Sequence, residues 1–136
     1  MFSHLHKVQF YETDQMGIVH HSNYLRFCEE ARVAWAHNSG LIDYQTPASA
    51  ARFAVLETRV KHLKPALFGD DLQILVQVKS EGIRIEFQYK IINAKNEVLA
   101  LVHTTHVPLS VDLRPMRLPK EMKEVLERES WKEIWL

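Results

Sequence analysis

The chain has 136 residues and a mass of 15.9 kDa, which is enough for one domain with a proper core and too little for two. Lysine and arginine number 17 together, as do aspartate and glutamate, and this balance excludes the strongly basic class of proteins that bind nucleic acid or anionic membranes. A single cysteine excludes an internal disulfide, and no export signal, transit peptide or apolar run of about 20 residues is recognisable, so we expect a cytoplasmic protein without stable membrane insertion.

The first predicted element is a strand over His4 to Tyr11, because apolar and polar residues alternate there. Leu5 and Lys7 share one face of this strand, and His6 lies on the other. The alternation ends at the sequence TDQMG, in which Gly17 is expected to adopt a backbone conformation that other residues resist.

A helix is predicted from Ser22 to Asn38, because apolar residues recur there at steps of three and four. Ser22 or Asn23 is suited to cap its start, and Gly40 is suited to follow its end. The apolar stripe of this helix comprises Tyr24, Phe27, Cys28, Ala31 and either Ala34 or Trp35.

The rest of the chain alternates like strands and ends in a second helix. An irregular crossing with Pro47 as a breaker is expected over residues 43–53. Strands are predicted over residues 53–65, 71–79, 83–91 and 97–109, with short polar turns at 80–82 and 93–96 that make neighbouring strands antiparallel. Residues 120–129, after Pro119, form the predicted second helix.

These elements predict how the chain is layered. A sheet with one apolar face needs a cover, and the helix over residues 22–38 is the long early helix with an apolar stripe. We therefore expect a single α+β domain over residues 1–136, with the element order β-α-β-β-β-β-α. Its curved antiparallel sheet is expected to wrap around the long helix as the central element.

The sequence ETDQMGIVHHSNYLRFCEEAR, over residues 12–32, resembles the signature of the hotdog-fold 4-hydroxybenzoyl-CoA thioesterase family. Members similar to this chain include acyl-CoA thioesterases associated with the Tol-Pal system. In the signature an Asp, a Gly two to three residues later, an apolar pair and an Asn-Tyr at a helix start recur. The sequences VKHLKPALFGDDLQILVQV and RPMRLPKEM resemble later parts of the family, so the resemblance extends from about residue 5 to about residue 125.

The resemblance implies a hotdog fold and hydrolysis of an acyl-CoA to a free acid and coenzyme A, and we expect neither a cofactor nor a metal. It also implies a homodimer with a continuous sheet and an active site at the subunit boundary, often paired into tetramers. Asp14 occupies the position of the catalytic acid, and His21 the position whose backbone amide polarises the thioester carbonyl. Some members carry a tyrosine four residues before the acid, where this chain has Phe10. The expected substrate contacts are Gly17, Ile18, Val19, Asn23 and Tyr24.

These residue types suit thioester hydrolysis, which needs an activated oxygen and positive polarity where the oxyanion develops. The start of a helix supplies that polarity, because its first amides lack partners within the helix. Asp14 can act as a general base on water or as a nucleophile that forms a mixed anhydride, and the sequence leaves both roles open. An exposed aspartate titrates near about 3.9 and is a poor base. The apolar residues Met16, Ile18 and Val19 are therefore expected to desolvate it.

The residues of the signature also have structural interpretations. Asp14 suits an ordinary turn. His20 and His21 suit a helix entrance without a chemical role. For a catalytic role, the position of His21 favours it over His20. Asn23 and Tyr24 suit a cap and a first core residue equally well.

Other reactive side chains have a simple structural reading. Cys28 lies on the apolar stripe, which favours a small buried residue over a nucleophile. His103 and His106 fall on opposite faces of a strand, so they do not form a metal site together. Asp70 and Asp71 suit a solvated turn. Lys61, Lys64, Arg114 and Arg117 suit either ordinary solvated positions or the phosphates of coenzyme A.

Two other functions use the same architecture. One is the hydration or dehydration of acyl thioesters, although relatives of that class usually show a different arrangement of histidine and acid. The other is binding of acyl thioesters without catalysis. The acyl group, and coenzyme A or an acyl carrier protein as the thiol half, stay open at this point.

Overall fold

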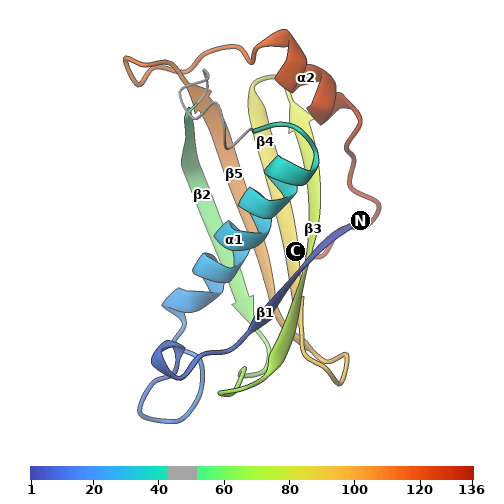
Figure 1. Cartoon of the computed structure of the whole chain (residues 1–136). Helices are drawn as coiled ribbons and strands as arrows, with labels where there is room; N and C mark the ends of the chain where they lie inside the picture. The colour runs from blue at the N-terminus through green and yellow to red at the C-terminus, as the bar shows by residue number, and fades with distance from the viewer. Residues whose placement is uncertain (43–51) are drawn as a thin grey trace.

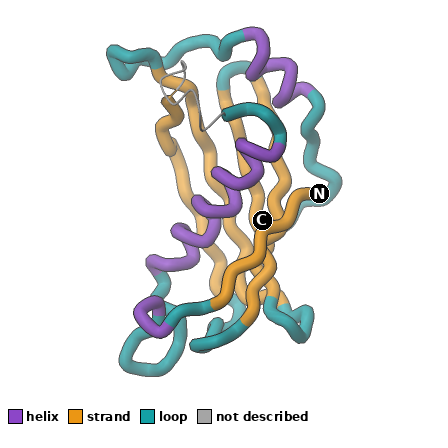
Figure 2. Tube along the Cα trace, in the orientation of Figure 1, coloured by secondary structure: helices purple, strands orange, loops and turns teal. Residues whose placement is uncertain are grey.

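The computed structural model describes residues 1–42 and 52–136, so the predicted crossing around Pro47 lies outside the described residues. The described part contains five strands and two α-helices, as the sequence predicts (Figures 1 and 2). Neither helix combines the length and the apolar character that crossing a bilayer requires. The elements in chain order are β1 (Phe2–Lys7), the 3₁₀ turn η1 (Phe10–Glu12), α1 (Ser22–Asn38), β2 (Arg52–His62), β3 (Asp71–Glu81), β4 (Arg84–Ile92), β5 (Val98–Leu109) and α2 (Lys120–Glu127).

The five strands form one sheet with the order β1-β3-β4-β5-β2, and all neighbours are antiparallel. The strands β1 and β2 are therefore its edges. Figure 1 shows α1 lying obliquely across one face of the sheet, while α2 lies near one end of β3 and β4. The start of α1 thus lies at the opposite end of the molecule from α2, close to the loop between β2 and β3.

The core lies between α1 and the face of the sheet that α1 covers. The predicted stripe of α1 is confirmed, because Tyr24, Phe27, Cys28, Ala31 and Trp35 are all buried. The predicted alternation of the strands is confirmed as well. Their buried residues on this face are Leu72, Ile74, Val76 and Val78 in β3 and Ile85, Phe87, Tyr89 and Ile91 in β4. Gly40 follows the helix end with a φ of +81°, as expected for a residue after a helical C-cap.

The opposite face of the sheet is covered too, which corrects the prediction of a single buried face. Gln77 of β3 accepts hydrogen bonds from the backbone of Lys132 (2.7 Å) and Glu133 (3.3 Å) through Oε1. Gln88 of β4 accepts bonds from the backbone of Trp135 and Leu136 in the same way (2.6 and 2.9 Å). The chain after α2 therefore lies across the outer face, and β5 is buried almost throughout.

Several boundaries differ from the prediction. The strand predicted over residues 53–65 ends at His62, and the helix predicted over residues 120–129 ends at Glu127. β1 ends at Lys7, because Phe10 to Glu12 form the turn η1, whose Glu12 carboxylate accepts the backbone N–H of Gln9 (2.7 Å) and contacts the ring of His6 (2.8 Å). The hairpin between β3 and β4 turns at residues 82–83, later than predicted, with a φ of +61° at Gly82.

Candidate active site

The segment between Asp14 and the start of α1 folds back on itself. The backbone N–H of Asp14 donates to the carbonyl of Ile18 (2.8 Å), and that of Gly17 donates to the carbonyl of Asp14 (3.0 Å). Gly17 has a φ of +78°, which confirms the conformation predicted for it. Val19 then donates its N–H to the carbonyl of Ala66 (2.9 Å), so the reversed loop is fixed against the connection between β2 and β3. This reversal returns Asp14 to the start of the helix.

The start of α1 is capped differently from the prediction. His21 is the N-cap residue, and neither Ser22 nor Asn23 occupies that position. The backbone N–H of Ser22 donates to Nδ1 of His20 (3.2 Å), and the hydroxyl of Ser22 lies 2.8 Å from the same nitrogen. Within residues 1–42 and 52–136, no atom accepts a hydrogen bond from the backbone N–H of His21. This N–H is therefore an available donor at the positive end of the helix.

Asn23 and Tyr24 fix the first turn of α1 to its surroundings. The amide of Asn23 is buried and donates to the backbone carbonyl of Glu12 (2.8 Å). The hydroxyl of Tyr24 accepts the backbone N–H of Ala66 (3.1 Å), and its ring meets that of His62 edge to face, with centroids 4.9 Å apart. Burial raises the pKa of Tyr24, so the phenol is protonated at neutral pH.

A cleft of about 370 Å³ opens at this helix start. Among the predicted site residues, Asp14, Ile18, Val19, His21 and Tyr24 line it, whereas Gly17 and Asn23 do not. Gly17 shapes the loop. Asn23 has a structural role other than the predicted cap, because its buried amide donates to the carbonyl of Glu12. The remaining lining residues are Met16, His62, Leu63, Lys64 and Pro65. His62, Leu63 and Pro65 were missed as site residues, although the sequence VKHLKP that contains them belongs to the family resemblance.

Asp14 combines a turn contact with a place in the cleft. One of its carboxylate oxygens, Oδ1, accepts the backbone N–H of Met16 (2.8 Å), which fixes the orientation of the half-buried carboxyl. Met16 itself is 75% exposed, so the expectation that its side chain desolvates Asp14 is wrong. Val19 is 3% exposed and is the apolar wall beside the acid.

Neither aromatic residue of the turn η1 reaches the cleft. Phe10 is 76% exposed and Tyr11 is 80% exposed, because both belong to a 3₁₀ turn and not to a strand. The ring of Phe10 contacts that of Phe68 edge to face at 5.8 Å. Among the described residues, Tyr24 is the tyrosine in the lining of the cleft.

The other reactive side chains lie elsewhere. Cys28 is fully buried, and this burial raises the pKa of its thiol, as expected for a core residue and not for a nucleophile. His103 contacts Glu86 (3.0 Å) and the ring of Trp131 on the outer face, whereas His106 contacts Phe87 on the inner face, as predicted. The predicted turn position of Asp70 is confirmed, because its Oδ2 accepts the backbone N–H of Leu67 (2.9 Å).

Four basic residues are candidates for the phosphates of coenzyme A, and one of them is at the cleft. Lys64 lines the cleft and forms an exposed ion pair with Glu97, with 2.5 Å between Nζ and Oε2. Lys61, Arg114 and Arg117 are exposed and do not line it.

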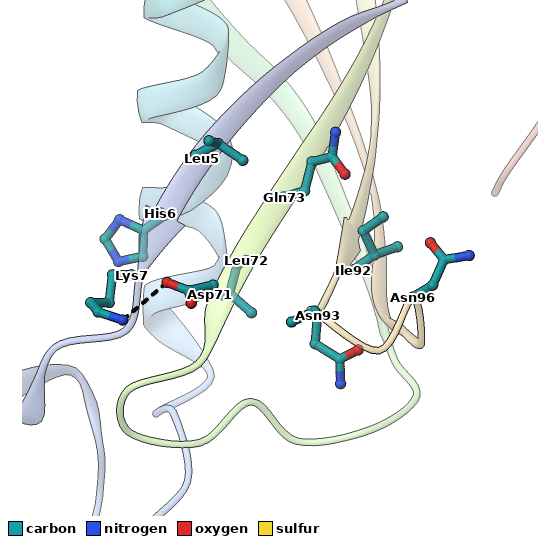
Figure 3. A pocket seen from close by; sticks show the side chains of 10 residues that line it. Leu5, His6, Lys7, Asp71, Leu72, Gln73, Ile92, Asn93 and Asn96 are labelled. Carbon is teal, nitrogen blue, oxygen red and sulfur yellow. Dashed lines mark hydrogen bonds and ion pairs between the residues drawn. The ribbon is translucent and has the colours of Figure 1, made fainter.

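A larger hollow of about 450 Å³ lies beside β1, β3 and the turn between β4 and β5 (Figure 3). Its charged residues Lys7 and Asp71 pair with each other (3.1 Å), and Figure 3 shows this pair at its edge. None of the predicted catalytic residues lines this hollow. Its size alone therefore does not make it the site of the chemistry.

Comparison with known proteins gives the same fold over nearly the whole chain. Residues 8–126, which include Asp14 and His21, match the family model described as the thioesterase-like superfamily. The 1,4-dihydroxy-2-naphthoyl-CoA hydrolase of Nostoc punctiforme is 32% identical over 130 residues, 93% of this chain and 86% of that protein. The acyl-CoA thioester hydrolase YbgC of Escherichia coli is 28% identical over 118 residues, 85% of this chain and 88% of that protein. The crystal structure of a hypothetical protein from Thermus thermophilus has a TM-score of 0.87 and 29% identity, covering 94% of this chain and 98% of its own.

Proposed function

Because the chain belongs to the thioesterase-like superfamily and has its hotdog-type fold, we propose that it hydrolyses an acyl-coenzyme A thioester to a free carboxylic acid and coenzyme A. The finer assignment to the 4-hydroxybenzoyl-CoA thioesterase family and its Tol-Pal-associated members is part of this proposal and rests on the signature over residues 12–32. The proposal also includes a single hotdog domain over residues 1–136, with the sheet wrapped around α1, and a cytoplasmic location.

One observation carries the assignment of the active site. The carboxyl of Asp14 and the residue His21, whose backbone N–H lacks an acceptor among the described residues, line the same cleft. A carboxylate can activate or supply the attacking oxygen, and a free amide at a helix start can stabilise the oxyanion, so the two groups meet the two demands of thioester hydrolysis. We assign the carboxylate of Asp14 as the catalytic group, acting as general base or nucleophile, and the His21 amide as the oxyanion donor.

In the general-base route, Asp14 takes a proton from a water molecule while the water oxygen forms a bond to the thioester carbon. The carbonyl oxygen becomes an oxyanion, which accepts the N–H of His21. When the carbonyl reforms, the C–S bond breaks. The thiolate of coenzyme A takes the proton from Asp14, so that the carboxylate is restored.

In the nucleophilic route, the Asp14 carboxylate attacks the thioester carbon and expels the thiolate, leaving a mixed anhydride that water then hydrolyses. A single turnover in the presence of hydroxylamine tests this route. Trapping of a hydroxamate on the peptide that contains Asp14 indicates that Asp14 is the nucleophile.

We also propose that the active unit is a homodimer, with further pairing into tetramers. The strand β2 is an edge of the sheet, and it exposes Val55 and Leu56, each by 53%. An exposed apolar edge strand is suited to pairing with a second copy of itself. Since β2 ends at His62 in the lining of the cleft, such a partner strand would lie beside the active site.

The proposed reaction is tested by measuring thiol release from short, long and aromatic acyl-CoAs, together with hydration of an enoyl thioester. Release of coenzyme A well above background from at least one saturated acyl-CoA supports the hydrolase. Hydration without thiol release would support the hydratase class, and binding without either reaction would support a non-catalytic role; both results would contradict the proposal.

A further inference from the structure

A second cavity, of about 230 Å³, lies between α1 and the sheet. It shares no lining residue with the catalytic cleft. Its walls are mainly apolar, and its polar residues are Arg32 of α1 and His106 of β5. The apolar walls include Trp35, Phe53, Ile85 and Phe87.

Among the described residues, the guanidinium of Arg32 has no charged partner. It donates one hydrogen bond to the hydroxyl of Tyr89 (3.0 Å) and lies 5.9 Å from the centre of the Phe87 ring. In the described part of the chain no carboxylate pairs with it. A guanidinium carries five N–H donors, and the hydrogen bond to Tyr89 uses one of them. A half-buried charge in apolar surroundings is costly unless an anion or strong acceptors compensate it.

Apart from the hydrogen bond accepted by Tyr89, the polar groups beside Arg32 do not supply that compensation. The hydroxyl of Tyr89 lies 2.9 Å from Oγ1 of Thr104, and Nε2 of His106 lies 2.8 Å from the same oxygen, so these groups bond to one another. Burial, and next the charge of Arg32, lower the pKa of His106 to about 4, so His106 is neutral at pH 7. Of the described residues that line the cavity, Arg32 is therefore the charged one.

We propose that this cavity is a binding site for a carboxylic acid that carries an apolar chain or ring. The carboxylate accepts a forked pair of hydrogen bonds from Arg32, and the apolar part lies between the rings of Trp35, Phe53 and Phe87. Arg32 follows His21 by eleven residues, or about 16 Å along the helix, so the bound acid is separate from the thioester site of the same chain. The product of the proposed reaction belongs to this chemical class, but the site binds it independently of turnover.

Trp35 in the wall provides a direct readout. We expect octanoate to change the fluorescence of the full chain in a saturable manner, and methyl octanoate, which has the same chain but no charge, to bind at least about tenfold more weakly. The Asp14→Asn variant is expected to bind octanoate as the wild type does. Normal octanoate binding by this variant would show that binding does not depend on hydrolysis at the proposed catalytic site.

Variants of two arginines on the same helix locate the site. Arg32→Met, which keeps an apolar stem, is expected to weaken octanoate binding at least about tenfold, and Arg32→Lys is expected to bind with intermediate affinity. Arg26→Met, which removes an exposed charge from α1 outside the cavity, is the matched control and should bind normally. Trp35→Phe should abolish the fluorescence change, which assigns the signal to the wall of this cavity.

The proposal is overturned if octanoate and its methyl ester bind equally well, if Arg32→Met and Arg26→Met have equal affinities, or if the fluorescence change persists in Trp35→Phe. The comparison of acid with ester uses the wild-type protein, so it decides the question even if Arg32→Met fails to fold.

Discussion

The side-chain amide of Asn23 donates a hydrogen bond of 2.8 Å to the backbone carbonyl of Glu12, in the buried space between α1 and the loop before it. The same carbonyl accepts the backbone N–H of His20 at 2.9 Å. These two bonds fix the first turn of the helix to the segment that carries Asp14. The acid and the proposed oxyanion donor therefore belong to one rigid local unit.

The role of the His21 amide can be separated from that of its side chain. His21 has a φ of −55°, a value that proline also adopts, so His21→Pro removes the N–H with little change of the backbone at that residue. We expect His21→Pro to lower kcat by about 10²–10³, the usual effect of losing one oxyanion donor. His21→Ala keeps the N–H and should retain most of the activity. Similar kcat values for the two variants, with both folded by circular dichroism, would argue against the amide as oxyanion donor.

Because Lys64 forms an ion pair with Glu97, substitutions of these two residues are predicted to have opposite effects on substrate binding. If Lys64 binds a phosphate of coenzyme A, Lys64→Met should raise KM by up to about fivefold, because an exposed charge contact contributes about 1 kcal/mol at most. Glu97→Gln removes the competing carboxylate and should lower KM. Steady-state kinetics at low salt measure both, and a KM unchanged in both variants would exclude Lys64 from coenzyme A binding.

His106 predicts a loss of stability in acid. Its pKa is lowered from 6.5 to about 4 in the folded protein, so between these values the unfolded chain binds a proton that the folded chain does not. The contribution of His106 to the free energy of unfolding is thus present above pH 6.5, and up to about 3 kcal/mol is lost as the pH falls to 4. Urea titrations of the wild type and His106→Gln should show a stability difference that changes over this range. A difference independent of pH would contradict the buried, neutral state of His106.

The chain after α2 is expected to stabilise the fold through Gln77. This buried side chain bonds to the backbone of Lys132 and Glu133, and Gln77→Leu leaves those groups without partners. We expect a loss of about 1–3 kcal/mol in the free energy of unfolding and a red shift of Trp131 emission. Gln73→Leu, on the same strand and in the lining of the hollow beside β1, is the control. Equal stability of the two variants would show that the bonds of Gln77 contribute little.

The helix and the strands were predictable because their signals are local and repeated. The apolar stripe of α1 and the alternation through Leu72, Ile74, Val76 and Val78 determine which faces are buried whatever the details of packing. The glycine conformations at positions 17 and 40 were predictable for the same reason, since few other residues tolerate a positive φ.

The features that depend on one side-chain conformation or on segments far apart in the chain were not predictable. His20 supplies an acceptor for the first turn of α1 only because its ring folds back over Ser22, and nothing in a capping pattern distinguishes it from Asn23. In the sequence, the polar residues Gln77 and Gln88 indicate a solvated face of the sheet. In the structure, the end of the chain covers them. His62 and Pro65 lie far along the chain from Asp14, so their place in the cleft follows from the contact between two loops.

The central claim is tested most directly by the rate of thiol release from an acyl-CoA substrate for Asp14→Asn compared with Asp70→Asn. Both aspartates accept a backbone N–H within a turn, from Met16 and Leu67, but only Asp14 lines the cleft. We predict that Asp14→Asn abolishes turnover while its melting temperature and oligomeric state match those of the wild type, and that Asp70→Asn retains activity. Hydrolysis at a near-normal rate by folded Asp14→Asn would contradict the assignment.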